Sequence, residues 1–297
     1  MRLHRIFLHF TLIYICAPFD ACAQKEEPCS PCRTNAVIGI GAVSAVGSYY
    51  MLDQLWYSQY ARSSFHTFND NNEWLQMDKA GHIMTCYTIG RYSSEILQWT
   101  GMNKTRSIWT GGSIGFIYMT GIEILDGRSK QWGFSWGDMI ANATGSFCYI
   151  AQEKIWNDQR IVFKFSYTPS SFADQYPDQF GQHFQQRILK DYNAQTYWAS
   201  INVSSFLASD AVFPKWLNVA AGYGATKMMN AKTNIYNVDN SKQQREFYLS
   251  FDADLTRVGW EKKWMKRTAK IFNFIKLPSP TLEANGSGRV KMHWLFF

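Results

Sequence analysis

Three pairs of polar residues stand at helical spacing at the ends of apolar segments, and they constrain the fold more than any other feature of the chain. The pairs are Asp78 with His82, Glu123 with Asp126, and Asp138 with Asn142. Residues three or four apart share one face of a helix, so each pair is directed to one side. Because burying such groups without partners costs several kcal/mol, we expect the helices to bring the pairs together.

Four segments of helical length precede residue 158. They cover residues 34–57, 78–99, 106–125 and 136–156. Ser135 lies immediately before the last of them and Asp138 falls in its first turn, which is typical of a helix N-terminus. Short connections between such helices predict a bundle of about four helices with polar side chains projecting inward.

The first segment contains a long stretch without charge, at residues 34–52. At a rise of about 1.5 Å per residue, about 19 helical residues just span the ~30 Å hydrocarbon core of a bilayer. A buried core helix would have a similar composition. We favour contact with a membrane, and the helical bundle is therefore predicted to be membrane-associated.

After residue 158 the pattern changes to an alternation of period two, which is typical of strands. The alternating stretches are residues 161–168, 197–207, 247–256 and 290–297. Residues 216–229 are ambiguous, because Pro214 could equally start a helix. Four or five strands are fewer than the eight of the smallest single-chain bacterial barrels. The predicted fold class is therefore α+β, with a helical domain at 34–157 and a β-rich region of antiparallel strands at 158–297.

Residues 259–275 combine tryptophans with a dense series of lysines. Trp260 and Trp264 stand among Lys262, Lys263 and Lys266. This composition predicts a cationic amphipathic helix that lies on a membrane surface. An ordinary surface helix whose aromatic face meets the sheet is an equally good interpretation.

The first 23 residues have the organisation of a secretory signal peptide. A short basic stretch precedes an apolar stretch, and Ala21-Cys22-Ala23 forms a small-x-small cleavage site. The protein is therefore predicted to be exported to the bacterial cell envelope. A lipoprotein acylated at Cys22 is a weaker alternative, because the aspartate two residues earlier fits such a site poorly. Residues 24–33 are expected to form a flexible tail.

The charge of the chain excludes some classes of partner. The chain has 30 basic and 23 acidic residues, of which two basic residues and one acidic residue lie in the predicted signal peptide at 1–23. Removal of that peptide leaves 28 basic and 22 acidic residues, a net charge of +6. No run of Lys or Arg is dense enough to predict nucleic-acid binding. Neither a P-loop nor a GxGxxG predicts a nucleotide. Membrane lipid is the expected partner, because an anionic membrane surface is the natural counter-charge for an exported protein.

The polar pairs supply groups that are able to take part in catalysis. A carboxylate one turn from an imidazole orients the ring and raises its basicity. The candidate catalytic residues are His82, Asp78, Glu123 and Asp138, with Lys79, Asp126 and Asn142 as supporting members of the cluster. If a divalent metal binds, the expected ligands are His82, Glu123, Asp126 and Asp138. The identity of any cofactor is left open, and neither an HExxH motif nor a serine-hydrolase nucleophile elbow is expected.

Each pair also has a purely structural interpretation. Asp78 and Asp138 lie near helix starts, where a carboxylate stabilises the helix dipole by about 0.3–1 kcal/mol. Glu123 and Asp126 are close in sequence to basic residues of the following loop and could pair with them. With three pairs at the mouths of three apolar helices, a functional site and a structural network are about equally good interpretations.

The same residues carry a resemblance to a known family. Asp78-Lys79-x-x-His82, then Glu123, then Gly133-Phe134-Ser135-x-x-Asp138-x-x-x-Asn142-x-x-Gly145 resemble the YfiM-like predicted periplasmic lipoproteins. More distantly, they are similar to the VanZ-like membrane proteins. The resemblance covers about residues 74–150 and implies an envelope location and a helical fold. It implies no established reaction, and the long β-rich half departs from the family pattern.

Three functions remain open at the level of sequence. The first is a structural envelope protein whose polar cluster ties the bundle together. The second is a metal-dependent or acid–base hydrolase or transferase that acts on a lipid-linked or cell-wall substrate, with His82 as acid, base or metal ligand. The third is a binding module whose aromatic C-terminal half contacts lipid or glycan.

Overall fold

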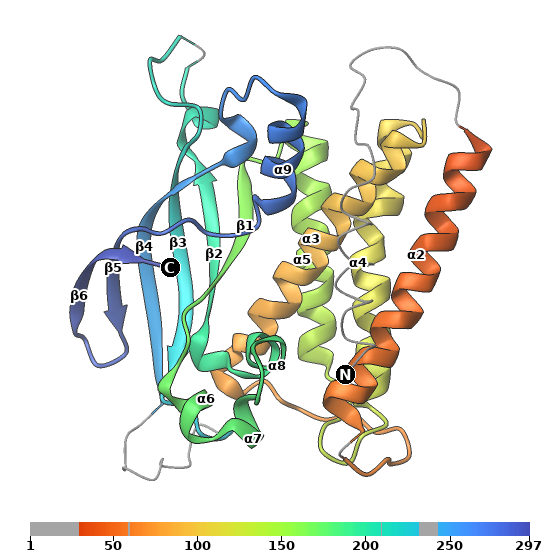
Figure 1. Cartoon of the computed structure of the whole chain (residues 1–297), viewed down its shortest axis with the longest axis vertical. Coiled ribbons are helices and arrows are strands. Elements are labelled where there is room, and N and C mark those ends of the chain that lie inside the picture. The colour runs from red at the N-terminus through yellow and green to blue at the C-terminus, as the bar shows by residue number, and fades with distance from the viewer. Residues whose placement is uncertain (1–29, 59, 209, 232–242) are drawn as a thin grey trace.

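The helical half contains the four predicted helices (Figure 1). The computed structural model describes residues 30–58, 60–208, 210–231 and 243–297. The four long helices are α2 Pro31–Leu52, which continues as a π-helical turn over Asp53–Tyr57, α3 Met77–Trp99, α4 Lys104–Asp126 and α5 Trp136–Trp156. The prediction of an α+β fold with an N-terminal helical region is confirmed.

Side chains at the helix starts explain where the helices begin. Asn103 accepts hydrogen bonds from two backbone N–H groups of the first turn of α4, and Ser135 accepts one from the N–H of Asp138. Ser30 caps α2 in the same way. Such caps stabilise a helix by about 1 kcal/mol each. The prediction of a flexible tail at 24–33 is wrong for its last three residues, because Pro31, Cys32 and Arg33 form the first turn of α2. Residues 24–29 and the predicted signal peptide at 1–23 lie outside the described residues.

Small residues let α3, α4 and α5 pack closely. A Cβ atom added to Gly115 of α4 would lie 2.4 Å from the carbonyl oxygen of Cys86 in α3, and one added to Gly145 of α5 would lie 2.2 Å from that of Ile83. No real side chain tolerates such distances, so only glycine fits at either position. Helix α2 lies along the outside of α4, where Tyr49 stacks on Tyr118 with ring centroids 4.9 Å apart.

The C-terminal half is a six-stranded antiparallel sheet in the simple order β1 to β6. The strands are β1 Ile161–Tyr167, β2 Gln195–Asn202, β3 Leu217–Thr226, β4 Gln244–Ala253, β5 Ser279–Asn285 and β6 Val290–Phe296. The ambiguous residues 216–229 are therefore largely a strand, and β5 was not predicted. Besides short 3-10 turns, the described part of the chain has four shorter α-helices: α6 Ser171–Gln175, α7 Pro177–Phe180, α8 Phe184–Lys190 and α9 Lys263–Phe272.

The sheet curls back on its first strand. The backbone N–H of Phe165 in β1 donates to the carbonyl of Phe274 at 2.8 Å, and the N–H of Lys276 donates to the carbonyl of Phe165 at 2.9 Å. The segment that leads into β5 thus covers the open edge of β1. This satisfies an edge that would otherwise present unpaired backbone groups.

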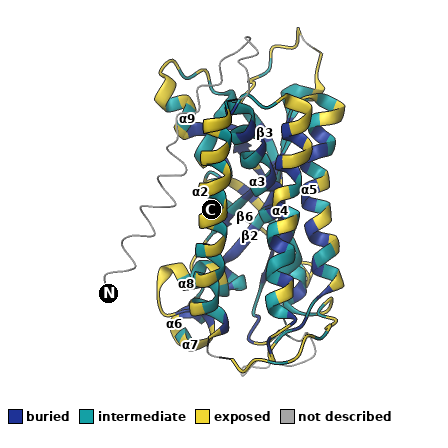
Figure 2. Cartoon of the chain, turned by 90° about the vertical axis from the view of Figure 1, so that its right-hand side faces the viewer, coloured by how far each residue is buried: buried dark blue, intermediate teal, exposed yellow. Residues whose placement is uncertain are grey.

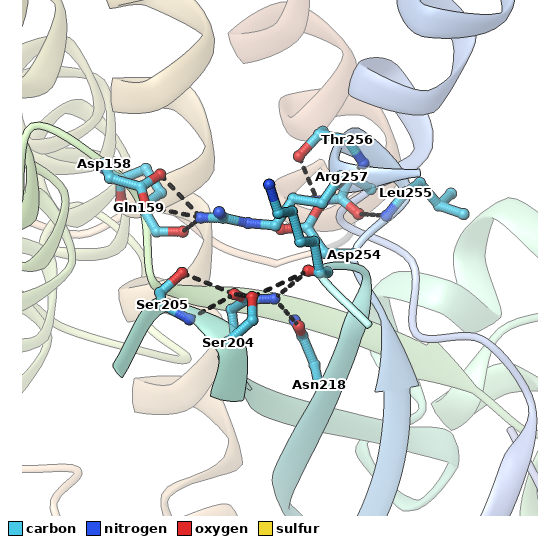
Figure 3. Close-up of polar contacts among 12 residues, drawn as sticks. Asp158, Gln159, Ser204, Ser205, Asn218, Asp254, Leu255, Thr256 and Arg257 are labelled. Carbon is cyan, nitrogen blue, oxygen red and sulfur yellow. Dashed lines mark hydrogen bonds and ion pairs between the residues drawn. The ribbon is translucent and has the colours of Figure 1, made fainter. Parts of the chain in front are cut away.

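The inner face of the curled sheet is polar. Lys164 of β1 forms an ion pair with Asp252 of β4 at 2.8 Å, and both side chains are fully buried. Ser200 donates to Asp252 at 2.6 Å, and Asn218 donates to Ser200 at 2.9 Å. Figure 3 shows how this polarity continues to the end of α5, where Arg257 contacts the carboxylate of Asp158 at 2.8 Å.

Candidate functional site

The polar pairs converge at one end of the bundle, where α3 and α5 begin and α4 ends. His82 of α3, Glu123 of α4 and both Asp138 and Asn142 of α5 are all buried, with Glu123 only 1% exposed. The helix starts of α3 and α5 and the helix end of α4 meet here because α4 runs antiparallel to both. The structure therefore brings together one member or more of each pair.

His82 lies at the centre of the cluster. Its Nδ1 is 2.9 Å from Oδ1 of Asn142, which is an oxygen acceptor, so Nδ1 carries a proton and donates it. The thiol of Cys86 donates to the same oxygen at 3.3 Å. This hydrogen bond leaves Nε2 facing Asp78 at 3.6 Å. Nε2 is consequently the ring atom that is available for proton transfer or metal binding.

Lys79 joins two carboxylates from different elements. Its Nζ lies 2.7 Å from Asp70, in the loop before α3, and 2.9 Å from Asp138 at the start of α5. Ser135 connects the same groups, because its hydroxyl donates to Asp70 at 2.6 Å and accepts from the backbone N–H of Asp138. Asp70 was not among the predicted site residues, since no helical spacing marks a residue in an irregular loop.

Two tyrosines bind the outer carboxylates of the cluster. The hydroxyl of Tyr192, between α8 and β2, donates to Asp78 at 2.9 Å. Tyr57, in the π-helical turn after α2, is hydrogen-bonded to Asp126. Asp126 is thus directed to Tyr57, one turn beyond Glu123. Neither tyrosine has a local sequence signal, because both reach the site only through the tertiary fold.

A strained backbone leads into the site. Trp74, Leu75 and Gln76 have φ angles of 46°, 50° and 63°, in the left-handed region that disfavours side-chain-bearing residues. The guanidinium of Arg245 in β4 contacts the side-chain oxygen of Gln76 at 2.5 Å and helps to hold this turn. Such strain costs about 1–3 kcal/mol per residue and persists only where surrounding contacts impose it. The sheet therefore helps to set the position of the first turn of α3.

Burial raises the pKa of three carboxyl groups in the cluster. The pKa of Glu123 rises to about 7, mainly through burial, against the opposing effect of His82. The pKa of Asp126 is well above its usual value because of burial and the nearby charge of Glu123. The pKa of Asp138 is raised by burial and by the charge of Asp78, while that of its neighbour Asp70 is lowered by hydrogen bonds from Asp138 and Lys79. The pKa values of these two neighbouring carboxyl groups are therefore shifted in opposite directions.

Three buried polar atoms of the cluster have no hydrogen-bond partner. They are Oε1 of Glu123, which lies 3.7 Å from Nδ1 of His82, Nδ2 of Asn142, and Oδ1 of Asp138, which faces Lys79 in an ion pair. The other oxygen of Glu123 accepts from the backbone N–H of Ser135 at 3.1 Å. Unsatisfied buried groups are uncommon in folded proteins and call for an explanation such as strain, chemistry or a bound species.

The geometry singles out one group of residues as a possible metal site. Ligand atoms of Asp78, His82 and Asp138 lie within 4.8 Å of one another. His82 and Asp138 belong to the ligand set predicted from sequence, whereas Asp78 takes the place of the predicted Glu123 and Asp126. The Nζ of Lys79 lies 2.9 Å from an oxygen of Asp138. A divalent ion here would displace or compete with that ammonium group.

The chain contains two pentapeptides with the spelling GxSxG, contrary to the expectation from sequence. One is centred on Ser113 and the other on Ser135. Ser113 lies within α4. Ser135 has ordinary extended backbone angles, φ −104° and ψ 122°, and acts as the N-cap of α5. A nucleophile elbow requires a strained strand-to-helix turn and a base on the serine, and His82 instead contacts Asn142 and faces Asp78. Neither serine has the setting of a hydrolase nucleophile.

The raised pKa of Glu123 predicts how stability changes with pH. The folded state holds this proton up to about pH 7, whereas the unfolded chain releases it near 4.5. Stability is therefore highest below about pH 4.5 and falls as the pH rises towards 7, by about 3 kcal/mol from this group. Chemical unfolding in mild detergent between pH 4.5 and 8 measures the slope. The Glu123→Gln variant should have a clearly smaller slope, and an unchanged slope would contradict this assignment.

Comparison with known proteins supports the predicted location. A family model described as "Predicted periplasmic lipoprotein (DUF2279)" matches residues 48–152, which are 105 of the 297 residues. The matched part holds α3, α4 and most of α5, and with them all of the predicted site residues. No curated protein and no solved structure gives a match. The protein is an α+β protein of the bacterial cell envelope, similar over a third of its length to a family of unknown function.

Proposed function

We propose that the protein is embedded in an envelope membrane through the outer side of its helical layer and that the polar cluster ties the helices together at one edge of that layer. The observation that carries this proposal is the distribution of polarity. Among the described residues, buried polar and charged side chains outnumber the buried apolar ones, while many large apolar side chains are exposed. Globular proteins in water rarely expose large contiguous apolar patches.

The exposed apolar side chains follow the outward faces of three helices, as Figure 2 shows by the exposed stripes on α2, α4 and α5. They are Ile38, Ile40, Val43, Val46 and Tyr50 of α2, Trp109, Ile114, Ile117 and Ile124 of α4, and Trp136, Ile140, Phe147 and Ile155 of α5. Ile117 and Phe147 are 66% and 69% exposed. Such residues gain about 1.5–3 kcal/mol each when they leave water.

Three uncharged stretches define the part of the layer that would lie in hydrocarbon: residues 34–52, 107–122 and 139–152. Of the described helices, α2 with its π-helical turn is the one that is long and apolar enough to cross a membrane by length and composition. The stretches in α4 and α5 are about 24 and 21 Å long. Trp109 and Trp136 lie near opposite ends of this layer, and tryptophan is enriched at both membrane interfaces.

In this proposal the polar cluster has a structural role. His82, Glu123 and Asn142 come from three different helices, and His82 contacts both of the others. Glu123 directly follows the uncharged stretch of α4, and Asn142 lies near the start of that of α5. Polar contacts between helices hold membrane bundles together, because hydrocarbon offers no competing partner. The close packing at Gly115 and Gly145 is the second feature that membrane bundles use.

Alkaline carbonate extraction of cell membranes tests the embedding. The Cys22→Ala variant removes any acyl anchor, and it should still remain in the membrane pellet. Adding Phe147→Lys should shift protein to the soluble or degraded fraction, because a lysine at the centre of the bilayer costs about 2.5–3.5 kcal/mol. Thr105→Lys, at an exposed position outside the uncharged stretches, is the matched control. Complete release of Cys22→Ala by carbonate would contradict the proposal.

A second candidate is a metal-dependent or acid–base hydrolase or transferase that acts on a lipid-linked or cell-wall substrate. The convergence of Asp78, His82 and Asp138 within 4.8 Å and the unpartnered Oε1 of Glu123 favour it. Titration of the purified protein with Mn²⁺ or Zn²⁺ discriminates between the two candidates. Stoichiometric binding that is lost in His82→Ala, with an unchanged unfolding midpoint, supports the enzyme. A midpoint that falls in His82→Ala, with no metal bound to the wild type, supports the structural role.

A further inference from the structure

An apolar cavity lies between α3 and the sheet. It has a volume of about 260 Å³, and its walls include Ala80, Ile83 and Met84 of α3, Phe163 of β1, Tyr197 of β2 and Ala221 of β3. Lys164 also lines it, but its ammonium group points to the other side of the sheet, where it contacts Asp252 and the carbonyl of Ala253. The cavity is smaller than the roughly 300–1,000 Å³ of pockets for drug-sized ligands.

The cavity opens onto an exposed apolar face of the same sheet. Directly paired residues of antiparallel strands share a face, and Ala221 is paired with Leu249, which is paired with Leu282, which is paired with Met292. Ala221 is exposed at the mouth. Phe247, Leu249 and Phe251 are 53–55% exposed. An uncharged path therefore leads from the wall of α3 across the outside of β3 to β6.

The inner end of the cavity lies beside the polar cluster. Tyr197 forms part of its wall, and the hydroxyl of Tyr197 would lie 2.9 Å from a Cβ atom added to Gly81, one residue before His82. Ala80 and Ile83 line the cavity on the same two helical turns that carry Asp78 and His82. A slender apolar ligand in the cavity would thus have one end next to the cluster.

We propose that this cavity holds one acyl chain of a membrane phospholipid, which enters sideways across Ala221 from the bilayer. The inference rests on the proposed embedding and extends it to the exposed apolar face of β4, β5 and β6, because a cavity that opens onto a face in hydrocarbon is filled by hydrocarbon chains. The apolar walls, the small volume and the continuous apolar path all fit a single flexible chain. The exposed face from Phe247 to Met292 is then the surface along which the lipid approaches.

Binding of a fluorescent fatty acid tests the cavity. The probe is 11-(dansylamino)undecanoic acid, added to full-length protein that has been delipidated in detergent. In a separate experiment, native mass spectrometry counts the phospholipid bound to protein that has not been delipidated. We expect saturable binding of one probe and retention of one phospholipid by the wild type. Ala221→Trp fills the mouth and should weaken probe binding at least tenfold, and Ala199→Phe should do so from β2 if Ala221→Trp folds poorly.

The control is Ala143→Trp, the same substitution at an exposed position of α5 away from the cavity; it should bind like the wild type. Equal binding by Ala221→Trp, or binding by the wild type that does not saturate, would overturn the cavity proposal. The carbonate extraction above separates the two proposals. Protein that stays in the membrane but binds no probe refutes the cavity alone, and protein that binds the probe but is fully extracted supports the cavity and refutes the embedding.

Discussion

Replacing Lys79 with methionine is expected to lower the free energy of unfolding by about 3–5 kcal/mol, because it removes the ammonium group that Asp70 and Asp138 both contact and leaves the charged Asp70 without its counter-charge. The side chain of Lys79 is 13% exposed, and its ammonium group contacts Asp70 at 2.7 Å and Asp138 at 2.9 Å. It is the one cation that joins the loop before α3 to the start of α5 within the described cluster. Its loss should therefore loosen both elements together.

Chemical unfolding of Lys79→Met in detergent measures this effect, with Lys104→Met as the matched control. Lys104 also pairs with a carboxylate, Glu153 at 3.4 Å, but its side chain is 45% exposed. Exposed pairs of this kind contribute about 0–1 kcal/mol. If Lys79→Met were no less stable than Lys104→Met, the polar cluster would not hold the bundle together, and its residues would have to be kept for chemistry.

The second large effect is expected inside the curled sheet, at Asp252. This carboxylate accepts from Lys164 at 2.8 Å and from Ser200 at 2.6 Å. Burial lowers the pKa of Lys276 to about 8, and the negative charge of Asp252 opposes that lowering. Asp252→Asn would leave two buried lysines without a carboxylate, and we expect a loss of about 3–5 kcal/mol.

Lys164→Met provides the comparison for Asp252. It removes one cation but leaves Lys276 near the carboxylate, so it should cost less than Asp252→Asn. Unfolding of both variants under the same conditions gives the order directly. A greater loss in Lys164→Met than in Asp252→Asn would show that Lys276 does not share the charge of Asp252.

The helical half was predictable because its signals are local. The spacing of Asp78 and His82, the cap at Ser135 and the uncharged stretches depend only on neighbours in sequence, and the four predicted helices agree with the structure to within a few residues. The convergence of the polar pairs was predictable to the same extent. His82, Glu123 and Asn142 meet as expected, whereas Asp70 and Tyr192 join the cluster through long-range contacts that leave no periodic pattern.

The sheet was less predictable for a related physical reason. Strand β5 contains Pro280 and Glu283, which weaken its own strand signal. Its position depends instead on long-range contacts: the segment just before it bonds to Phe165 of β1, and the strand itself pairs with β4. Residues 216–229 are rich in glycine and alanine, which suit both a helix and the close packing of β3 against Trp198. The polar inner face of the sheet follows from curling, which alternation alone does not reveal.

Hydrophobic photolabelling in native membranes tests the central claim most directly. A diazirine probe that dissolves in the bilayer labels side chains exposed to hydrocarbon, and mass spectrometry locates the labels without any substitution in the protein. The account predicts labels at Val43 of α2, Ile117 of α4 and Phe147 of α5, and none at buried Ile108. Labelling of these outward residues by a water-soluble diazirine instead, with none from the bilayer probe, would contradict the embedding of the helical layer.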